Sequence, residues 1–125
     1  MSLFHAVVSI DHLSAQVLQF DAEHVEVQKV HARSHDTRQH KSIVRTEHEF
    51  FGEVCDALSE VREVLVTGSS TALSDFRHYV EKHRLPVALQ IVGWESVDHP
   101  TDGQLIVLAR KFFVNREQMV GIPTP

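Results

Sequence analysis

Cysteine is almost absent from this chain, and long apolar runs and an excess of positive charge are missing altogether. Cys55 is the only cysteine in 125 residues, which excludes an internal disulfide. No apolar run approaches the roughly 18 residues that a membrane span needs, and no basic-then-apolar leader opens the sequence. These absences predict a cytoplasmic protein that does not contact a membrane.

The charge balance is acidic, with 12 Lys and Arg against 17 Asp and Glu, a formal net charge of −5. Because phosphate neutralisation dominates affinity for nucleic acid, this balance argues against a DNA-binding protein, although a basic segment can still exist locally. The hydrophobic fraction of 42% is ordinary for a globular domain. The length predicts one domain, over residues 1–115, followed by a flexible tail over residues 116–125.

The first third of the chain predicts three strands joined by short turns, at residues 3–10, 15–20 and 25–30. Val25 and Val27 alternate with Glu26 and Gln28, a pattern typical of a half-exposed strand. Val17 and the aromatic residue three positions later cannot share one face at period two, which predicts a register irregularity in the second strand.

Helical and strand patterns alternate in the rest of the chain. Thr46 and Glu49 have capping-box spacing and predict a helix over residues 47–61, in which Cys55 belongs to the buried face. A strand at residues 63–67, a helix to about residue 84, a strand at residues 87–94 and a helix from Asp102 follow. The order βββ-α-β-α-β-α predicts an α/β fold, a ribonuclease H-like mixed sheet with helices packed on it.

Residues 31–46 form the most basic window of the chain and show no periodicity, which predicts an exposed loop. Basic side chains of this kind bind RNA phosphates, although no aromatic residue interleaves to stack bases. The candidate RNA- or partner-binding residues are Arg33, Arg38, His40, Lys41 and Arg45.

Three segments carry a family resemblance: AVVSIDHLSAQVLQFDAEHVEVQKVHA from residue 6, EVLVTGSSTALSDFRHYVEKH from residue 63, and IVGWESVDHPTDGQLIVLARKFF from residue 91. They resemble a bacterial family often called translational machinery proteins, over about residues 4–113. That family is similar to the middle domain of archaeal and eukaryotic peptide release factors and their ribosome-rescue relatives. The most specific part is the motif Asp98, His99, Pro100, Thr101, Asp102, Gly103 and Gln104, interpreted as structural.

The resemblance does not carry over the activity of the release factors. Their Gly-Gly-Gln loop corresponds to the basic window here, where the one glutamine, Gln39, lies between Arg38 and His40. Glycine lets a backbone approach its substrate closely, and these neighbours do not. Gly103 and Gln104 open a helix elsewhere in the fold and are interpreted as capping residues. Relatives have Gly-Pro-Gly and a lysine where this chain has Gly-Ser-Ser from residue 68 and Leu73.

The residues also offer candidates for two other chemistries. A two-metal nuclease on this fold needs converging carboxylates, for which Asp11 and either Glu49 or Glu53 are candidates, but the strand at residues 63–67 ends without one. The histidines that flank or occupy the basic window are metal candidates, though their spacing fits no structural zinc motif. These are His31, His35, His40 and His48.

The residues and the resemblance together predict a non-catalytic protein without a cofactor, associated with the ribosome or ribosomal RNA through residues 33–46. A metal-dependent hydrolase or nuclease is the first alternative. A homodimeric interaction module, paired through an exposed edge strand at residues 25–30, is the second.

Overall fold

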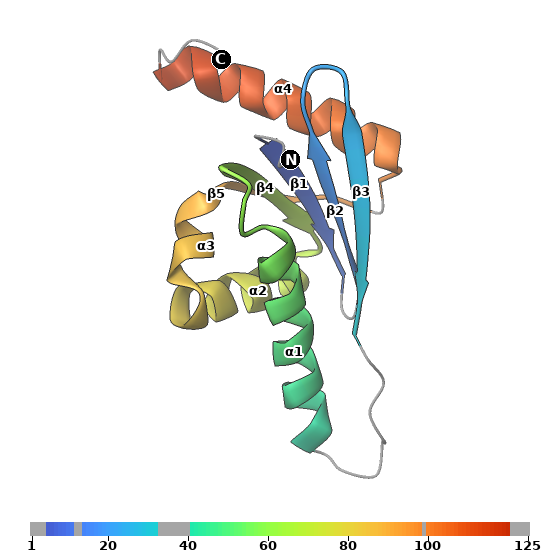
Figure 1. Ribbon diagram of the computed structural model, residues 1–125, viewed down its shortest axis with the longest axis vertical. Helices are drawn as coiled ribbons and strands as arrows, with labels where there is room; N and C mark the ends of the chain where they lie inside the picture. Colours follow the sequence, from blue (N-terminus) through green and yellow to red (C-terminus); the bar gives the residue numbers. More distant parts are fainter. Residues whose placement is uncertain (1–4, 12–13, 33–40, 99, 121–125) are drawn as a thin grey trace.

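The computed structural model describes residues 5–11, 14–32, 41–98 and 100–120 (Figure 1). The chain forms one five-stranded mixed sheet with helices on both faces, and the α/β class with a mixed sheet is therefore confirmed. The strands, in chain order, are β1 His5–Ile10, β2 Ser14–Phe20, β3 Val25–His31, β4 Glu63–Gly68 and β5 Ile91–Ser96. The helices are α1 Lys41–Ala57, α2 Ser70–His83, α3 Leu85–Gln90 and α4 Asp102–Val120.

The spatial order of the strands is β3-β2-β1-β4-β5. The β1–β2 and β2–β3 pairs are antiparallel, as predicted, whereas β4 runs parallel to both β1 and β5. The carboxyl ends of β1, β4 and β5 consequently lie along one edge of the sheet, where ligands bind in many open α/β sheets.

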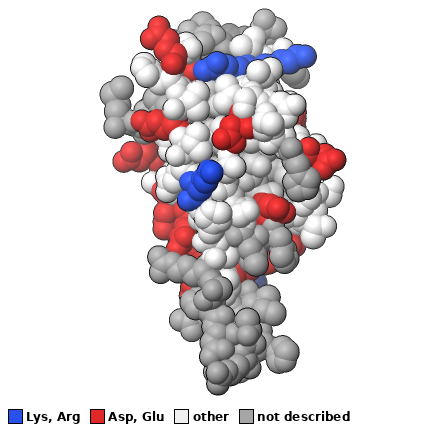
Figure 2. All heavy atoms as spheres, turned by 90° about the vertical axis from the view of Figure 1, so that its right-hand side faces the viewer, with Lys and Arg blue, Asp and Glu red and all other residues white. Residues whose placement is uncertain are grey.

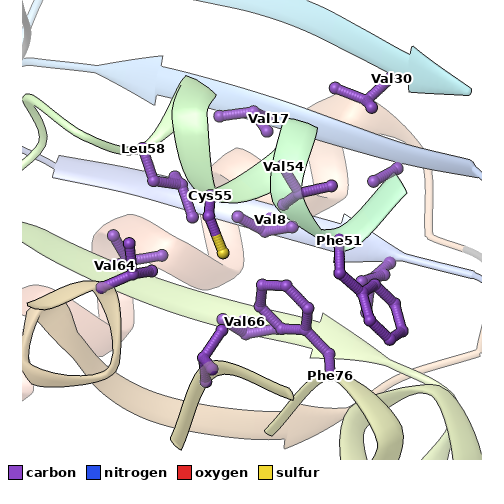
Figure 3. Packing of buried hydrophobic residues seen from close by; sticks show 14 of the residues in the cluster. Val8, Val17, Val30, Phe51, Val54, Cys55, Leu58, Val64, Val66 and Phe76 are labelled. Carbon is purple, nitrogen blue, oxygen red and sulfur yellow. The ribbon is translucent and has the colours of Figure 1, made fainter. Parts of the chain in front are cut away.

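The larger core lies between the sheet and helices α1 and α2 (Figure 3). Phe51 and Cys55 of α1 pack there against Val8 and Val66 of the central strands and against Phe76 of α2, as the helical pattern predicts. The sulfur of Cys55 points into this cluster. Burial raises the pKa of the Cys55 thiol to about 12, because the thiolate would lose its hydration.

The opposite face of the sheet is covered by α4 (Figure 1). Leu105, Ala109 and Phe113 of this helix pack on Val7, Leu18, Phe20 and Leu65 of the sheet. The expected register irregularity in β2 is absent, because the pairing with both neighbours is continuous. Val17 faces the α1 layer and Phe20 faces α4. Because β2 is covered on both faces, side chains at odd and at even positions along it can both be buried.

Several predicted elements differ from the structure, beginning with α1, which was expected over residues 47–61 and spans Lys41–Ala57. Residues 87–90 belong to helix α3 rather than to the last strand, because Pro86 occupies the first turn of a new helix, where its missing N–H costs nothing. Strand β3 is exposed along both faces except at Val30, which packs in the core beneath α1. Helix α4 continues to Val120, five residues beyond the point where the tail was expected to begin.

Candidate nucleic-acid interface

Helix α1 begins at Lys41, so the predicted RNA-binding residues divide into two groups. Lys41 and Arg45 belong to its first two turns, whereas Arg33, Arg38 and His40 lie outside the described residues. The early start also corrects the predicted capping box, since Thr46 and Glu49 fall inside the helix rather than at its beginning. Helical spacing at i, i+4 and i+7 places residues 41, 45 and 48 on one side of α1.

An aromatic cluster lies between α1 and α2, with His48 on α1 and Tyr79 and His83 on α2. The ring centroids of His48, Tyr79 and His83 form a triangle, at 5.3 Å for His48–Tyr79, 5.5 Å for His48–His83 and 5.2 Å for Tyr79–His83. Phe51 supports the cluster from the core side, 5.4 Å from the Tyr79 ring. Tyr79 is half-buried, and both histidines are exposed.

The cluster lines a groove of about 290 Å³ at the molecular surface. Lys82 and His78 supply positive or ionisable groups to its wall, and Glu47 and Asp75 supply negative ones. Exposed rings next to a lysine are the combination that unstacked bases and the adjoining phosphates bind. We call this site the α1–α2 groove.

His31 is separated from this groove. It ends β3 and lines two other depressions, one of about 500 Å³ against α1 and one of about 300 Å³ beside Pro100. The first is acidic, because Glu53, Asp56 and Glu60 border it. The second contains Asp11 and the side chain of Gln16, whose buried Oε1 has no hydrogen-bond partner among the described residues.

The histidines considered as metal ligands do not form a site in the described part of the chain. His31 and His48 lie in different depressions, and His35 and His40 are outside the described residues. Residues 5–11, 14–32, 41–98 and 100–120 contain no group of three or more His, Cys, Asp or Glu side chains that could hold a metal ion.

Two of the nuclease candidates, Asp11 and Glu53, line different depressions. Asp11 lines the depression next to Pro100, and Glu53 lines the one against α1. At the end of β4, the buried polar side chain has a structural role: the Thr67 hydroxyl donates a hydrogen bond to the Val8 carbonyl oxygen over 2.8 Å. Ser69 caps α2 by accepting a hydrogen bond from the Ala72 N–H.

The turn before α4 contains a reciprocal capping box. The Gln104 N–H donates to Thr101 Oγ1 over 3.1 Å, and the Thr101 N–H donates to Gln104 Oε1 over 2.8 Å. Asp98 and Asp102 are exposed, and His99 is outside the described residues. Gln104 is therefore used to begin a helix, at a position unrelated to residues 33–46.

Comparison of the sequence with protein-family models and with curated proteins found no match. Solved structures do match. Pelota from Archaeoglobus fulgidus superposes with a TM-score of 0.62 at 19% identity, over 90% of this chain and 32% of Pelota. The archaeal translation termination factor aRF1 gives 0.58 at 13% identity, over 94% of this chain and 42% of aRF1.

The chain shares the fold of one part of these translation factors. A third match is archaeal Pelota in a ribosome-bound model with ABCE1, with a TM-score of 0.60, 19% identity and coverage of 89% of this chain and 34% of that one. The resemblance to release factors predicted from the sequence is thus confirmed at the level of the fold. The chain spans about a third to two fifths of the length of these proteins.

Sequence reasoning missed Tyr79, Lys82 and His83. They follow His48 by 31 to 35 residues, and no local periodicity connects two helices that are separated by a strand. The one available signal was the pair Tyr79 and His83, which have i, i+4 spacing and so lie on one side of α2.

Proposed function

We propose that this chain is a non-catalytic, release-factor-like domain that contacts ribosomal RNA through residues 33–46 and the α1–α2 groove. In this proposal the fold corresponds to the ribonuclease H-like middle domain of the release factors, and the protein acts in the cytoplasm with the translation machinery. The likeness to Pelota and aRF1 supports a role in translation.

The observation that carries the proposal is the position of the aromatic cluster relative to the basic residues. The ring of His48 lies next to those of Tyr79 and His83, and His48 belongs to the helix whose first two turns contain Lys41 and Arg45. In this proposal the basic segment offers phosphate contacts, and the rings offer stacking surfaces that the segment itself lacks.

The acidic net charge is consistent with RNA contact through one basic segment and a few aromatic rings. With a formal charge of −5, the molecule as a whole repels phosphate, so RNA contact must be confined to a local surface. Affinity should therefore fall steeply with salt through the few basic residues of segment 33–46. The part of the affinity that comes from stacking on the rings should depend less on salt, because stacking releases no counterion.

Fluorescence anisotropy with a single-stranded RNA oligonucleotide and co-sedimentation with ribosomes, each at low and high salt, test the proposal. Arg38→Ala with Lys41→Ala should weaken both and flatten the salt dependence. His48→Ala or His83→Ala should weaken RNA binding roughly 5- to 100-fold with an unchanged salt slope, and His48→Phe should retain it.

His24→Ala is the matched control, since His24 is exposed on the β2–β3 turn, at the opposite end of the molecule from α1 (Figure 1). It should bind RNA like the unaltered chain. Binding that is absent at low salt, or that responds equally to His24→Ala and His48→Ala, would refute the proposal.

A further inference from the structure

Strand β3 is an outer strand of the sheet and is seven residues long. It pairs with β2 on one side, and no strand in the described part of the chain pairs with its other side. Two of its three valines are exposed, Val25 by 43% and Val27 by 47%. An edge of this length with exposed valines is a template for pairing with another strand.

The register identifies which backbone groups of β3 point outward. The β2–β3 turn closes with the Asp21 N–H donating to the His24 carbonyl oxygen over 3.0 Å, next to the Phe20–Val25 pair. Because hydrogen-bonded and non-hydrogen-bonded pairs alternate in an antiparallel ladder, every second residue after His24 bonds to β2. The remaining residues direct their N–H and C=O groups outward, and these are Val25, Val27, Lys29 and His31.

The same alternation places the exposed valines against an existing core. Val25 pairs with Phe20 and Val27 pairs with Leu18, and both partners are buried in the α4 layer. The two valines therefore continue the apolar surface under α4 out to the sheet edge. Charged groups of both signs are scattered over this side of the molecule, with uncharged surface between them (Figure 2).

We infer that β3 pairs with β3 of a second copy of this chain, antiparallel, about a two-fold axis through Val27. A two-fold axis perpendicular to the sheet keeps each side chain on its own face, so paired residues must have the same parity and the axis must pass through a residue. The candidate axes through the centre of the strand are the four from Glu26 to Lys29.

Charge and apolar contact together select among these axes. An axis through Glu26 or Lys29 places two like charges directly opposite each other, which destabilises a ladder. Axes through Gln28 and Val27 make no like-charge pair, and each places one valine opposite Lys29. The axis through Gln28 also places Glu26 opposite Val30 and brings no two valines together. The axis through Val27 brings the two Val27 side chains together, pairs Glu26 with Gln28, and pairs Val25 with Lys29.

The dimer would be one ten-stranded sheet with a short interface. Few side-chain pairs contribute, so we expect dimerisation to depend on concentration and to reverse on dilution. Covalent trapping suits such an interface. The self-paired position falls within the Cα separations that a disulfide spans, since residues of a hydrogen-bonded pair lie about 5.5 Å apart.

The first experiment is oxidative cross-linking of Val27→Cys in the full chain. Cys55 provides a clean background, because its thiol is fully buried and burial raises its pKa to about 12. Val27→Cys should form a covalent dimer at a rate that falls on dilution. Gln28→Cys, one residue away on the opposite face, should not; equal or faster cross-linking of Gln28→Cys overturns the inference.

The second experiment is sedimentation velocity over a range of concentrations. The unaltered chain should shift from monomer to dimer, and Val27→Lys should remain a monomer with unchanged circular dichroism. Val107→Lys is the matched control, because Val107 is 69% exposed on α4 and should leave the dimer intact. An unaltered chain that remains a monomer up to its solubility limit, or a dimer that Val27→Lys does not dissociate, refutes the inference.

Discussion

Nη1 of Arg116 lies 2.7 Å from Oε2 of Glu63, so the last part of α4 is tied to the first residue of β4. The other carboxylate oxygen of Glu63 lies 3.1 Å from Nε2 of His5, whose ring packs on Phe113 with 4.2 Å between centroids. Both charged side chains are largely shielded from water. This contact holds α4 in place beyond Asn115, where the sequence predicted a tail.

The Glu63–Arg116 ion pair should contribute measurably to stability. Arg116→Ala and Glu63→Ala should each lower the free energy of unfolding by about 1 kcal/mol, since each change leaves a partly buried partner without its hydrogen bond. Urea unfolding of both single variants and the double variant measures the coupling, which we expect at about 0.5–1 kcal/mol. A coupling of zero would show that the contact is not formed in solution.

Gly68 should not tolerate a side chain. An added Cβ would collide with the backbone carbonyl oxygen of Ile10, at the place where β1 and β4 end side by side. Because this obstacle is backbone rather than a movable side chain, Gly68→Ala should lower the free energy of unfolding by about 2–3 kcal/mol. Gly103→Ala is the control, since nothing lies within 4 Å of its added Cβ; equal effects in urea unfolding would contradict the prediction.

The Thr101 hydroxyl should stabilise the fold as the N-terminal cap of α4. Thr101→Ala removes the acceptor for the Gln104 N–H and should cost about 1 kcal/mol in the free energy of unfolding. Thr101→Ser keeps the hydroxyl oxygen and should cost little. Thermal unfolding followed by circular dichroism compares the two, and a serine variant as unstable as the alanine variant would contradict a capping role.

Asp21 should make the stability of the hairpin sensitive to acid. Its carboxylate accepts hydrogen bonds from the backbone N–H groups of Glu23, over 2.8 Å, and His24, over 2.6 Å, and these lower its pKa below the ordinary 3.8. A lowered folded-state pKa stabilises the fold above pH 3.8, and this stabilisation disappears as the pH falls through the folded-state value.

Carbon-13 NMR titration of the Asp21 carboxyl group should therefore give a midpoint below 3.8. Asp21→Asn should lose the stabilisation near neutral pH and unfold with a weaker pH dependence in that acidic window. A midpoint at or above 3.8 would show that the turn does not hold the ionised carboxylate.

The Cys55 thiol should be unreactive in the folded protein. It is fully buried and its pKa is raised to about 12, so both access and ionisation are suppressed. Iodoacetamide at pH 8 should leave the native chain unmodified and should alkylate Cys55 completely in concentrated urea. Rapid alkylation of the native chain would place this thiol outside the core.

The apolar patterns of the sequence determined most of the secondary structure. Five strands and three of the four helices were predictable, because a helix buried on one face must repeat its apolar residues at helical spacing, as Phe51 and Cys55 do. Helix α3 was not predictable in this way, since its six residues look like the beginning of the apolar strand that follows. The resemblance to release factors was also readable from the sequence alone, and the fold of Pelota and aRF1 confirms it.

Only the tertiary structure decided which distant side chains meet. It placed His48 next to Tyr79 and His83 across two helices, separated His31 from His48, and left Val25 and Val27 uncovered at the edge of the sheet. The physical reason is that periodicity reports which face of an element is buried. It does not report which neighbouring element covers that face, or whether any element does.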